Sequence, residues 1–424
     1  MNKKILSGIF ALISITLFAQ QRDTLKLSIT KIEKSFVTDT VYYFSSRIDT
    51  IALQPLKTDT SKVVKDVNPQ DLTESKYKIK LLGSIRVNSF YDFNGMTSTE
   101  GFLPYDIPVG EQKVEGLSSV YIGARQSRLG LEGTANTKVG SIKTYMEVDF
   151  ASSTSSFWRL RHAFAEWNYF KIGYTWSTFM DNASLPNTID FEGPNSSISK
   201  RHGLIRYESK FTENSIAGFS IESPQTDYFN PADSLIENKN KQSNFDLAGR
   251  YKYIQPWGHV QVAGLFRQIS YLHVDKMDKL YGWGLLFSSI FELNEKNKLY
   301  GQYSLGEGIS HYVVGFSNRL LDAVYNPNVN DMAIKQANGG FVTYIYSLNK
   351  KTTFSLTSGL SFIKVYDFEA QDNFSSSQYL AVNGFYYPIE TIRLGAEITT
   401  GSRINANGQK GSATRISFLG SFSF

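Results

Sequence analysis

Apolar and polar side chains alternate with a period of two from Lys76 onward. The first clear stretch is "KYKIKLLGSIRVNSFYDF". One face of this stretch is apolar and carries Ile79, Leu81, Ile85, Val87 and Tyr91; the other carries Lys80, Ser84, Arg86, Asn88 and Asp92. The closing stretch "TRISFLGSFSF" repeats the pattern, with Ile416, Phe418, Phe422 and Phe424 separated by polar or small residues. This alternation predicts β-strands with one apolar face and one polar face.

Sixteen such segments follow one another along the chain. Their residue ranges are 78–92, 116–134, 139–150, 157–167, 169–176, 201–209, 215–224, 244–254, 258–271, 280–292, 298–309, 338–347, 351–366, 376–387, 391–402 and 412–424. Short connections such as "ANTK", "TEN" and "NEKN" follow every even-numbered segment, and the other connections hold most of the loop residues. Short turns at one end, long loops at the other and an even number of strands are typical of bacterial outer-membrane barrels.

The barrel prediction also explains the closing stripe. In lipid every backbone polar group must be paired, so a sheet spans a membrane only when it closes. We therefore expect the last segment to pair with the first, with Phe418, Phe422 and Phe424 facing lipid. A terminal Phe on such a strand also resembles the signal read by the barrel assembly machinery. Aromatic residues at segment ends predict interfacial girdles; they are Tyr91, Tyr169, Trp176, Tyr253, Tyr300 and Tyr387.

The first 75 residues have a different texture. Residues 1–20 combine two Lys, an apolar stretch from Ile5 to Phe18 and the small residue Ala19, which predicts a secretory signal peptide. Residues 21–75 are polar and Thr-rich, and we interpret them as a periplasmic extension preceding a barrel at 76–424. The chain contains 55 Tyr and Phe residues, 32 Gly and no Cys. This composition favours an all-β fold and excludes disulfides and thiolate metal sites.

A barrel of sixteen strands is wide enough to leave an aqueous channel. Segments two to five place five basic side chains on the predicted inner wall: Arg128, Lys143, Arg159, Arg161 and Lys171. On the fourth segment, Arg159 and Arg161 lie opposite Trp158, Leu160 and Phe164, and no acid alternates with them. Pairs such as Arg128 with Glu132 or Lys143 with Glu147 are an alternative, purely structural reading of the other cations.

The connection at 177–200 is the candidate constriction loop. It contains Pro186 and Pro194 and the apolar residues Phe179, Met180 and Leu185, and a loop this long seldom floats freely. Folded into the lumen, it would set its acidic groups across from the arginines; these groups are Asp181, Asp190 and Glu192. Charged side chains at a narrow point select ions by sign, and basic ones favour anions.

Residues 120–210 carry a family resemblance. The stretches "ARQSRLGLEG", "KTYMEVDF" and "SSFWRLRHAFAEWNYFKIGYTWSTFMDNASLPNTIDFEGPN" resemble the DcaP-like porins. The resemblance implies a trimer of 16-stranded barrels and passive uptake of small anions, including dicarboxylates. It maps the family's basic constriction onto Arg128, Arg159 and Arg161. Two features depart from the family: residues 21–75 lack the heptads of its usual coiled coil, and Tyr174 replaces a glutamine.

The sequence therefore predicts a porin of the Gram-negative outer membrane. Small anionic solutes would diffuse past Arg128, Lys143, Arg159 and Arg161, and the barrel would contact membrane lipid and lipopolysaccharide. A phosphate-selective channel and a structural or adhesive barrel with a plugged lumen are the alternatives. No hydrolase, metalloprotease or nucleotide-binding motif is present, so we expect no enzyme activity, metal or cofactor. The basic residues are dispersed along strands, which argues against a nucleic-acid partner.

Overall fold

A computed structural model describes residues 27–31, 42–48, 77–93, 96, 101–114, 116–151, 158–231, 242–273 and 275–424. The chain forms two compact units, Met1–Lys80 with Gly133–Ser141 and Leu81–Glu132 with Ile142–Phe424. In the first unit, β1 (Leu27–Lys31) and β2 (Tyr42–Ile48) form an antiparallel pair. The predicted signal peptide at 1–20 lies outside the described residues, as does the rest of the predicted extension at 21–75.

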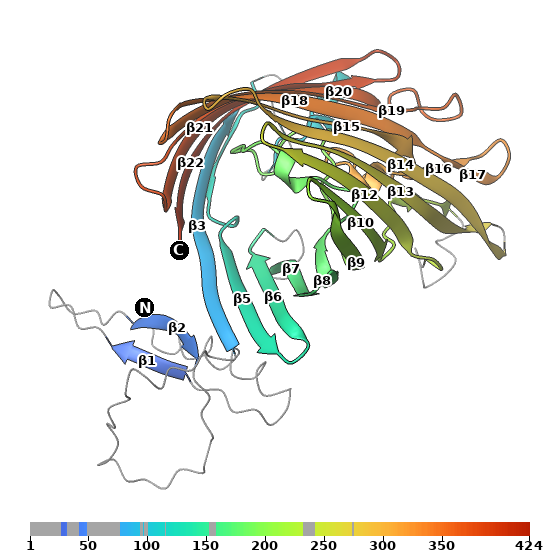
Figure 1. The fold of residues 1–424 in the computed structure, drawn as a ribbon. Helices are drawn as coiled ribbons and strands as arrows, with labels where there is room; N and C mark the ends of the chain where they lie inside the picture. The colour runs from blue at the N-terminus through green and yellow to red at the C-terminus, as the bar shows by residue number, and fades with distance from the viewer. Residues whose placement is uncertain are drawn as a thin grey trace, which may run out of the picture. The chain divides into compact units, whose positions relative to one another are not determined.

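The second unit holds all but a few strand ends of an antiparallel barrel (Figure 1). Its strands are β3 (Tyr77–Asp92), β4 (Ser119–Gly123), β5 (Arg128–Thr137), β6 (Gly140–Asp149), β7 (Arg159–Trp167), β8 (Phe170–Trp176), β9 (Arg201–Thr212), β10 (Ser215–Glu222), β12 (Asp246–Gln255), β13 (Gly258–His273), β14 (Lys276–Glu292), β15 (Asn297–Glu307), β18 (Gln336–Asn349), β19 (Thr352–Ile363), β20 (Phe374–Tyr386), β21 (Ile392–Asn405) and β22 (Lys410–Ser423). Because β4 and β5 both pair with β3, they are two pieces of one barrel strand. In the described part of the chain the barrel thus has sixteen strands, which confirms the prediction.

The barrel closes where the last strand meets the first. β22 pairs with β3 from Arg415–Asp92 to Ser423–Ser84, and Phe424 and Gly83 exchange two backbone hydrogen bonds of 3.0 Å. Phe418, Phe422 and Phe424 remain exposed on the outside. The closing stripe is therefore both the seam of the barrel and part of its apolar outer face.

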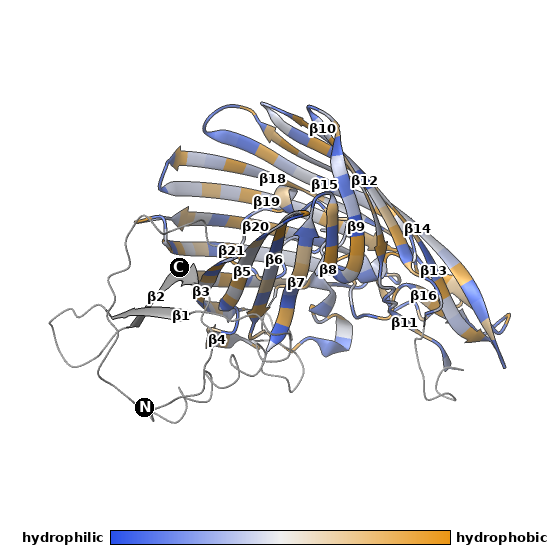
Figure 2. Cartoon of the chain, turned by 60° about the horizontal axis from the view of Figure 1, so that its bottom comes forward, coloured by the Kyte–Doolittle hydropathy of each residue, from blue (hydrophilic) through white to orange (hydrophobic). Residues whose placement is uncertain are grey.

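Hydropathy alternates along the strands, as the sequence predicts (Figure 2). β14 is a clear example, because Trp283, Leu285 and Phe287 are exposed on the outer face whereas Leu286 and Ser288 are buried on the inner face. Such an inverted arrangement, apolar outside and partly polar inside, suits a sheet surrounded by lipid. Among the described residues, no helix is long and apolar enough to cross a membrane.

Turn lengths follow the predicted alternation with two differences. One end of the barrel has short turns throughout, for example at 168–169, where Asn168 takes a left-handed φ of 52°. At the other end, β14 begins only three positions after the end of β13, and residues 406–409 alone separate β21 from β22. There the strands themselves are longer than predicted, since β13 and β14 have 16 and 17 residues. About 9–11 residues suffice to span a bilayer, so these hairpins extend beyond it.

Two long connections fold back and pack against the inner wall. The first, residues 177–200, contains the 3₁₀ helix η4 (Asn182–Ser184); the second, residues 308–335, contains η6 (Ser310–Tyr312), β16 (Ala323–Asn326) and β17 (Asp331–Ile334). β16 also pairs with the short β11 (Tyr228–Phe229), and a further connection contains η2 (Pro104–Asp106) and η3 (Gly110–Gln112).

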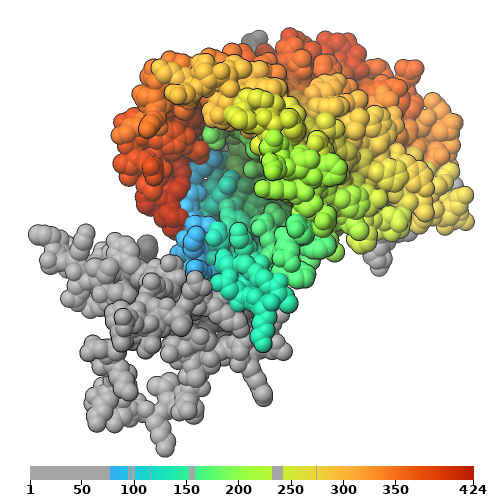
Figure 3. All heavy atoms as spheres, viewed as in Figure 1, coloured from blue at the N-terminus to red at the C-terminus, as the bar shows by residue number. Residues whose placement is uncertain are grey.

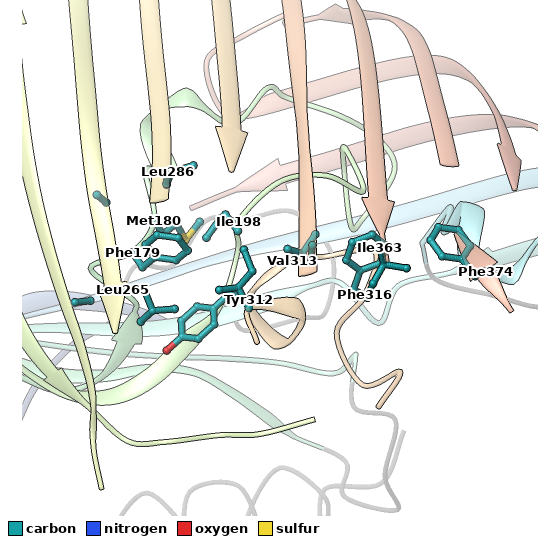
Figure 4. Packing of buried hydrophobic residues seen from close by; sticks show 14 residues of the cluster. Phe179, Met180, Ile198, Leu265, Leu286, Tyr312, Val313, Phe316, Ile363 and Phe374 are labelled. Carbon is teal, nitrogen blue, oxygen red and sulfur yellow. The ribbon is translucent and has the colours of Figure 1, made fainter. Parts of the chain in front are cut away.

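An apolar cluster joins the two connections to the inner face of the barrel (Figure 4). Phe179 and Met180 come from the first connection, Tyr312 and Phe316 from the second, and Leu286 from β14. The rings of Phe179 and Tyr312 meet edge to face with centroids 5.7 Å apart. Trp176, which the sequence predicts in an aromatic girdle, packs against this cluster instead. The lumen therefore contains a compact core that holds the first connection in place.

Candidate functional site

The segment 177–200, called here the inner loop, lies inside the barrel and crosses from β8 to the opposite wall (Figure 1). Beyond its tip, Asn195 donates from Nδ2 to the hydroxyls of Ser361 (3.1 Å) and Ser377 (2.5 Å) on the inner face of β19 and β20. Ile198 forms a β-bridge with Val313 of the second connection. These contacts attach the inner loop to the barrel wall and to the second connection.

Asp181 attaches the first part of the inner loop. Its carboxylate accepts hydrogen bonds from Lys252 Nζ (2.7 Å), His259 Nε2 (2.6 Å) and Ser288 Oγ (2.8 Å). Burial opposes ionisation of Asp181, but the His259 hydrogen bond and the Lys252 charge outweigh it and hold the pKa of Asp181 well below its usual value. This acid is therefore an ionised anchor, and its partners lie on β12–β14, away from the predicted arginines.

Asp190 lies at the tip of the inner loop in a different environment. Its backbone N–H donates to Glu397 Oε1 (2.8 Å) and that of Ile189 to Oε2 (2.9 Å). The Asp190 carboxyl group accepts from the backbone N–H of Phe102 (2.8 Å) and from Tyr379 Oη (3.0 Å). Burial, and then the nearby Glu397 charge, raises the pKa of Asp190 to about 7.

Glu192 follows the tip and is partly buried. Burial raises the pKa of Glu192, and the charges of Arg159, Lys200 and Arg201 partly oppose that rise. The neighbouring Phe191 ring lies 5.2 Å from the Arg159 guanidinium carbon. This part of the loop, unlike Asp181, does face the arginines of the wall.

Arg159 and Arg161 both point toward acids of the neighbouring strand. Arg159 binds Asp149 through two hydrogen bonds of 2.9 and 2.6 Å. Arg161 donates to Glu147 (2.6 Å) and to Asp149 (2.8 Å). No acid alternates with the two arginines along β7, but the pairing of β6 with β7 supplies acids from the neighbouring strand.

The two other predicted cations are less constrained. Arg128 is about a third exposed, and its Nη1 lies 3.9 Å from Glu147 Oε1, at the limit of an ion pair. Lys143 is exposed and lies opposite Glu166 in the register of β6 and β7. The structure thus brings Arg128, Arg159 and Arg161 together around Glu147 and Asp149 and leaves Lys143 apart.

A β-bulge on β7 changes one predicted orientation. The register slips between Glu147–His162 and Val148–Leu160, so Arg161 is an extra residue on its strand. Beyond the bulge every side chain changes face. Phe164 therefore lies opposite Tyr145 and beneath the Lys171 ammonium group on the inner side, rather than outside with Leu160.

A cavity of about 410 Å³ lies between the tip of the inner loop and the wall. The wall contributes the side chains of Arg86, Arg128 and Arg393, and the loop contributes residues 186–188 together with Asp190 and Phe191. Arg86 Nη2 donates to the Ile189 carbonyl (2.8 Å). With all atoms drawn, the barrel is hollowed on the face seen in Figure 3.

Sequence reasoning missed Arg86 and Arg393 as site residues. Both lie on the polar faces of predicted strands, but some 300 positions separate them in the chain. Closure of the barrel brings them together, because Ser421 of β22 pairs with Arg393 on one side and with Arg86 on the other. The predicted pairing of the first and last strands was the signal that could have found them. In the described part of the chain, no group of His, Asp and Glu could hold a metal ion.

Comparisons with solved structures show the same barrel fold in other proteins. The outer membrane channel DcaP of Acinetobacter baumannii has a TM-score of 0.73 at 21% identity, covering 83% of this chain and 99% of that one. An anion-selective porin from Comamonas acidovorans follows at 0.55 and 12%, covering 82% and 100%. OmpT of Vibrio cholerae follows at 0.52 and 10%, covering 83% and 99%. No curated protein matches the chain.

A family model adds a match in sequence to these matches in fold. The model of the DcaP outer membrane protein family matches residues 51–424, which include the whole barrel. That match confirms the resemblance seen around the RLRHA and GYTWSTFMD stretches. The chain therefore belongs to the DcaP outer membrane protein family and is a porin of the outer membrane.

Proposed function

We propose that this porin lets small anions diffuse through the barrel and that an excess of arginine sets its preference for anions. The main support for this proposal is the cavity between the tip of the inner loop and the wall, called here the arginine cavity, because three guanidinium groups line it. Among the described residues, neither Arg86 nor Arg393 forms an ion pair, and Arg128 has only the 3.9 Å contact with Glu147. Guanidinium groups keep their charge at all physiological pH values, so the cavity stays positive.

The part of the wall formed by β6 and β7 contributes less net charge than the cavity does. Arg159 and Arg161 are balanced by Glu147 and Asp149, two cations against two anions. They still offer guanidinium edges to a passing solute, and we keep them with Arg128 and Lys143 in the proposed anion path. Asp181 is neutralised by Lys252, and Asp190 and Glu192 are the acidic groups of the loop that face this path.

The proposed solutes are dicarboxylate-like anions, the class that the family resemblance implies. Phosphate remains the alternative, because arginine clusters bind phosphate and carboxylate by the same paired hydrogen bonds. A homotrimer is proposed as the assembly. It rests on the family resemblance and on the likeness to OmpT of Vibrio cholerae, which is known in a trimer form.

The direct test is the reversal potential of the reconstituted channel across a KCl gradient. Wild type should be anion-selective, and R86Q/R393Q should lose selectivity severalfold because two of the three cavity charges are gone. K350Q, which removes an exposed charge in the turn between β18 and β19, is the matched control and should leave selectivity unchanged.

Three results would contradict parts of the proposal. Cation selectivity in wild type would overturn anion passage itself. If anion selectivity were unchanged in R86Q/R393Q but fell in R159A/R161A, the charges that select anions would be those of Arg159 and Arg161 on β7. Absence of conductance would favour the plugged structural barrel. Competition of chloride current by a dicarboxylate and by phosphate then separates the two solute classes.

A further inference from the structure

Two carboxyl groups meet at the tip of the inner loop, and in the described part of the chain neither has a cation within ion-pair distance. Asp190 and Glu397 are both buried, and Asp190 gives its backbone N–H to the Glu397 carboxylate at 2.8 Å. Among the described residues, neither acid forms an ion pair. Buried acids normally carry a cationic partner or take up a proton. One of these two groups is therefore the natural proton acceptor.

Hydrogen bonding decides which group keeps its charge. Glu397 accepts four hydrogen bonds of 2.8 to 3.2 Å; the donors are the backbone N–H groups of Ile189 and Asp190, Asn383 Nδ2 and Thr399 Oγ1. Donors of this kind stabilise a carboxylate. Asp190 has two short donors, Phe102 N–H and Tyr379 Oη, and a weaker one of 3.4 Å from Glu192 N–H. The proton thus belongs on Asp190.

The groups that face Asp190 come from every neighbouring element. They are Glu397 and Thr399 on β21, Tyr379 on β20, Arg415 on β22, Arg86 on β3, Glu192 on the inner loop itself, and Phe102 on the connection between β3 and β4. Arg415 is already held by two hydrogen bonds of 2.7 and 2.8 Å to Asp92. Arg86 directs its Nη2 to the Ile189 carbonyl at 2.8 Å and forms no ion pair with Asp190 among the described residues. The facing charges therefore leave Asp190 without a dedicated counter-ion.

Asp190 also lines the arginine cavity. A proton on this residue removes one of the negative charges that oppose Arg86, Arg128 and Arg393. We propose that Asp190 is a specificity-determining residue of the pore and that its proton, taken up from the cavity, strengthens the preference for anions. This inference rests on the proposed anion passage and adds to it a residue that makes selectivity depend on pH.

The pH at which the change occurs follows from the surroundings. Burial, and then the Glu397 charge, raises the pKa of Asp190 to about 7, whereas the hydrogen bond from Phe102 and the charge of Arg415 lower it again in part. The protonated form therefore dominates in mildly acid medium and the ionised form in mildly alkaline medium. An ordinary exposed carboxyl group titrates several pH units lower, so its effect would not fall in this range.

The experiment measures the reversal potential of the full-length channel in KCl gradients from about pH 6 to about pH 8. Wild type should show one step to higher anion selectivity as the pH falls, with a midpoint near 7. D190N should lack the step and stay at the more anion-selective level, because the amide copies the neutral acid. E397Q should move the midpoint down by about one pH unit or more, because the neighbouring charge is gone.

Glu390 supplies the matched control, since it lines the same cavity but is exposed to solvent. E390Q should keep the step at its wild-type midpoint. A step that persists in D190N, or a midpoint that E397Q leaves in place, would overturn the inference. Anion selectivity without any step in wild type would also overturn it while leaving the proposed function intact. Cation selectivity throughout would instead overturn the proposed function.

Discussion

The inner loop attaches to the barrel through two aspartates that behave in opposite ways. Asp181 meets Lys252, His259 and Ser288. The His259 hydrogen bond and the Lys252 charge hold the pKa of Asp181 well below the usual value. Asp190, nine residues later, meets Glu397, and its pKa rises to about 7. Both side chains are at least 95% buried, so burial alone does not explain the difference.

The comparison shows that the partner across the lumen, rather than depth, sets the role of each acid. A cationic partner turns a buried carboxylate into a permanent anchor, whereas an anionic partner makes it responsive to pH. The first attachment can therefore stay constant while the second changes its charge beside the arginine cavity. One loop thus combines a fixed position with a variable charge.

Among the variants considered, Asp181→Ala is expected to reduce the stability of the folded protein most. It leaves Lys252 and His259 largely buried without their carboxylate, and breaking a buried pair in this way costs about 3–5 kcal/mol. The first part of the inner loop should loosen. Single-channel recordings should then show a larger and noisier conductance, and protease should cut within 177–200.

Asp181→Asn serves as the control for that change. The amide keeps the shape and can still accept from Ser288 and Lys252, so its effect should be smaller. A quiet channel of wild-type conductance in Asp181→Ala would contradict the anchoring role.

Asp190→Asn should have an intermediate effect on the free energy of unfolding, and it should stabilise the protein where Asp181→Ala destabilises it. The folded chain binds the Asp190 proton more tightly than the unfolded chain does, so wild type loses stability as the pH rises from about 4 to about 7. The amide has no proton to lose, and the variant should exceed wild type by about 2–4 kcal/mol at pH 8 and match it near pH 4. Unfolding followed by gel mobility at each pH measures this.

Asp181 makes the opposite contribution to the pH profile. Its depressed pKa adds stability above the unfolded value, near 4, and that stability is lost as the pH falls further.

The Asp190→Asn prediction has a clear contradicting outcome. Equal stability of wild type and Asp190→Asn at pH 8 would show that Asp190 ionises freely in the folded state.

Tyr379→Phe should have the smallest effect. It removes one hydrogen bond to the Asp190 carboxylate, a contribution of about 1 kcal/mol. The ionised form loses this support, so the selectivity step should move to higher pH by up to about one unit. Reversal potentials measure the shift. A step that moves to lower pH would mean that Tyr379 supports the neutral acid instead.

Much of the barrel could be predicted because its physics is local and repetitive. Each strand must present one face to lipid and one to the lumen, so a period of two marks all sixteen strands, and strand order follows the chain. The predicted strand limits were less accurate where strands are longer than the bilayer requires, as in β13 and β14. The bulge at Arg161 escaped the pattern, because one inserted residue leaves no signature in composition.

The site was only partly predictable for a different reason. Arg128, Arg159 and Arg161 were found from their place on polar faces, but their partners Glu147 and Asp149 lie on another strand. The prediction that the acids of 177–200 face the arginines describes Glu192 and the cavity-lining Asp190; Asp181 instead faces Lys252 and His259.

The sequence by itself determined that the chain closes into a lipid-facing barrel and that a long, partly apolar segment follows the fifth predicted strand, 169–176. Alternation and loop length suffice for this, since both follow from the chemistry of a single strand in a membrane. The tertiary structure decided which charges are neutralised and which remain free. Arg86 and Arg393 become neighbours only when β22 closes onto β3, and Asp190 acquires its variable proton only where the loop tip reaches Glu397. Charge interactions depend on distances across the lumen, and these distances are set by closure rather than by position in the chain.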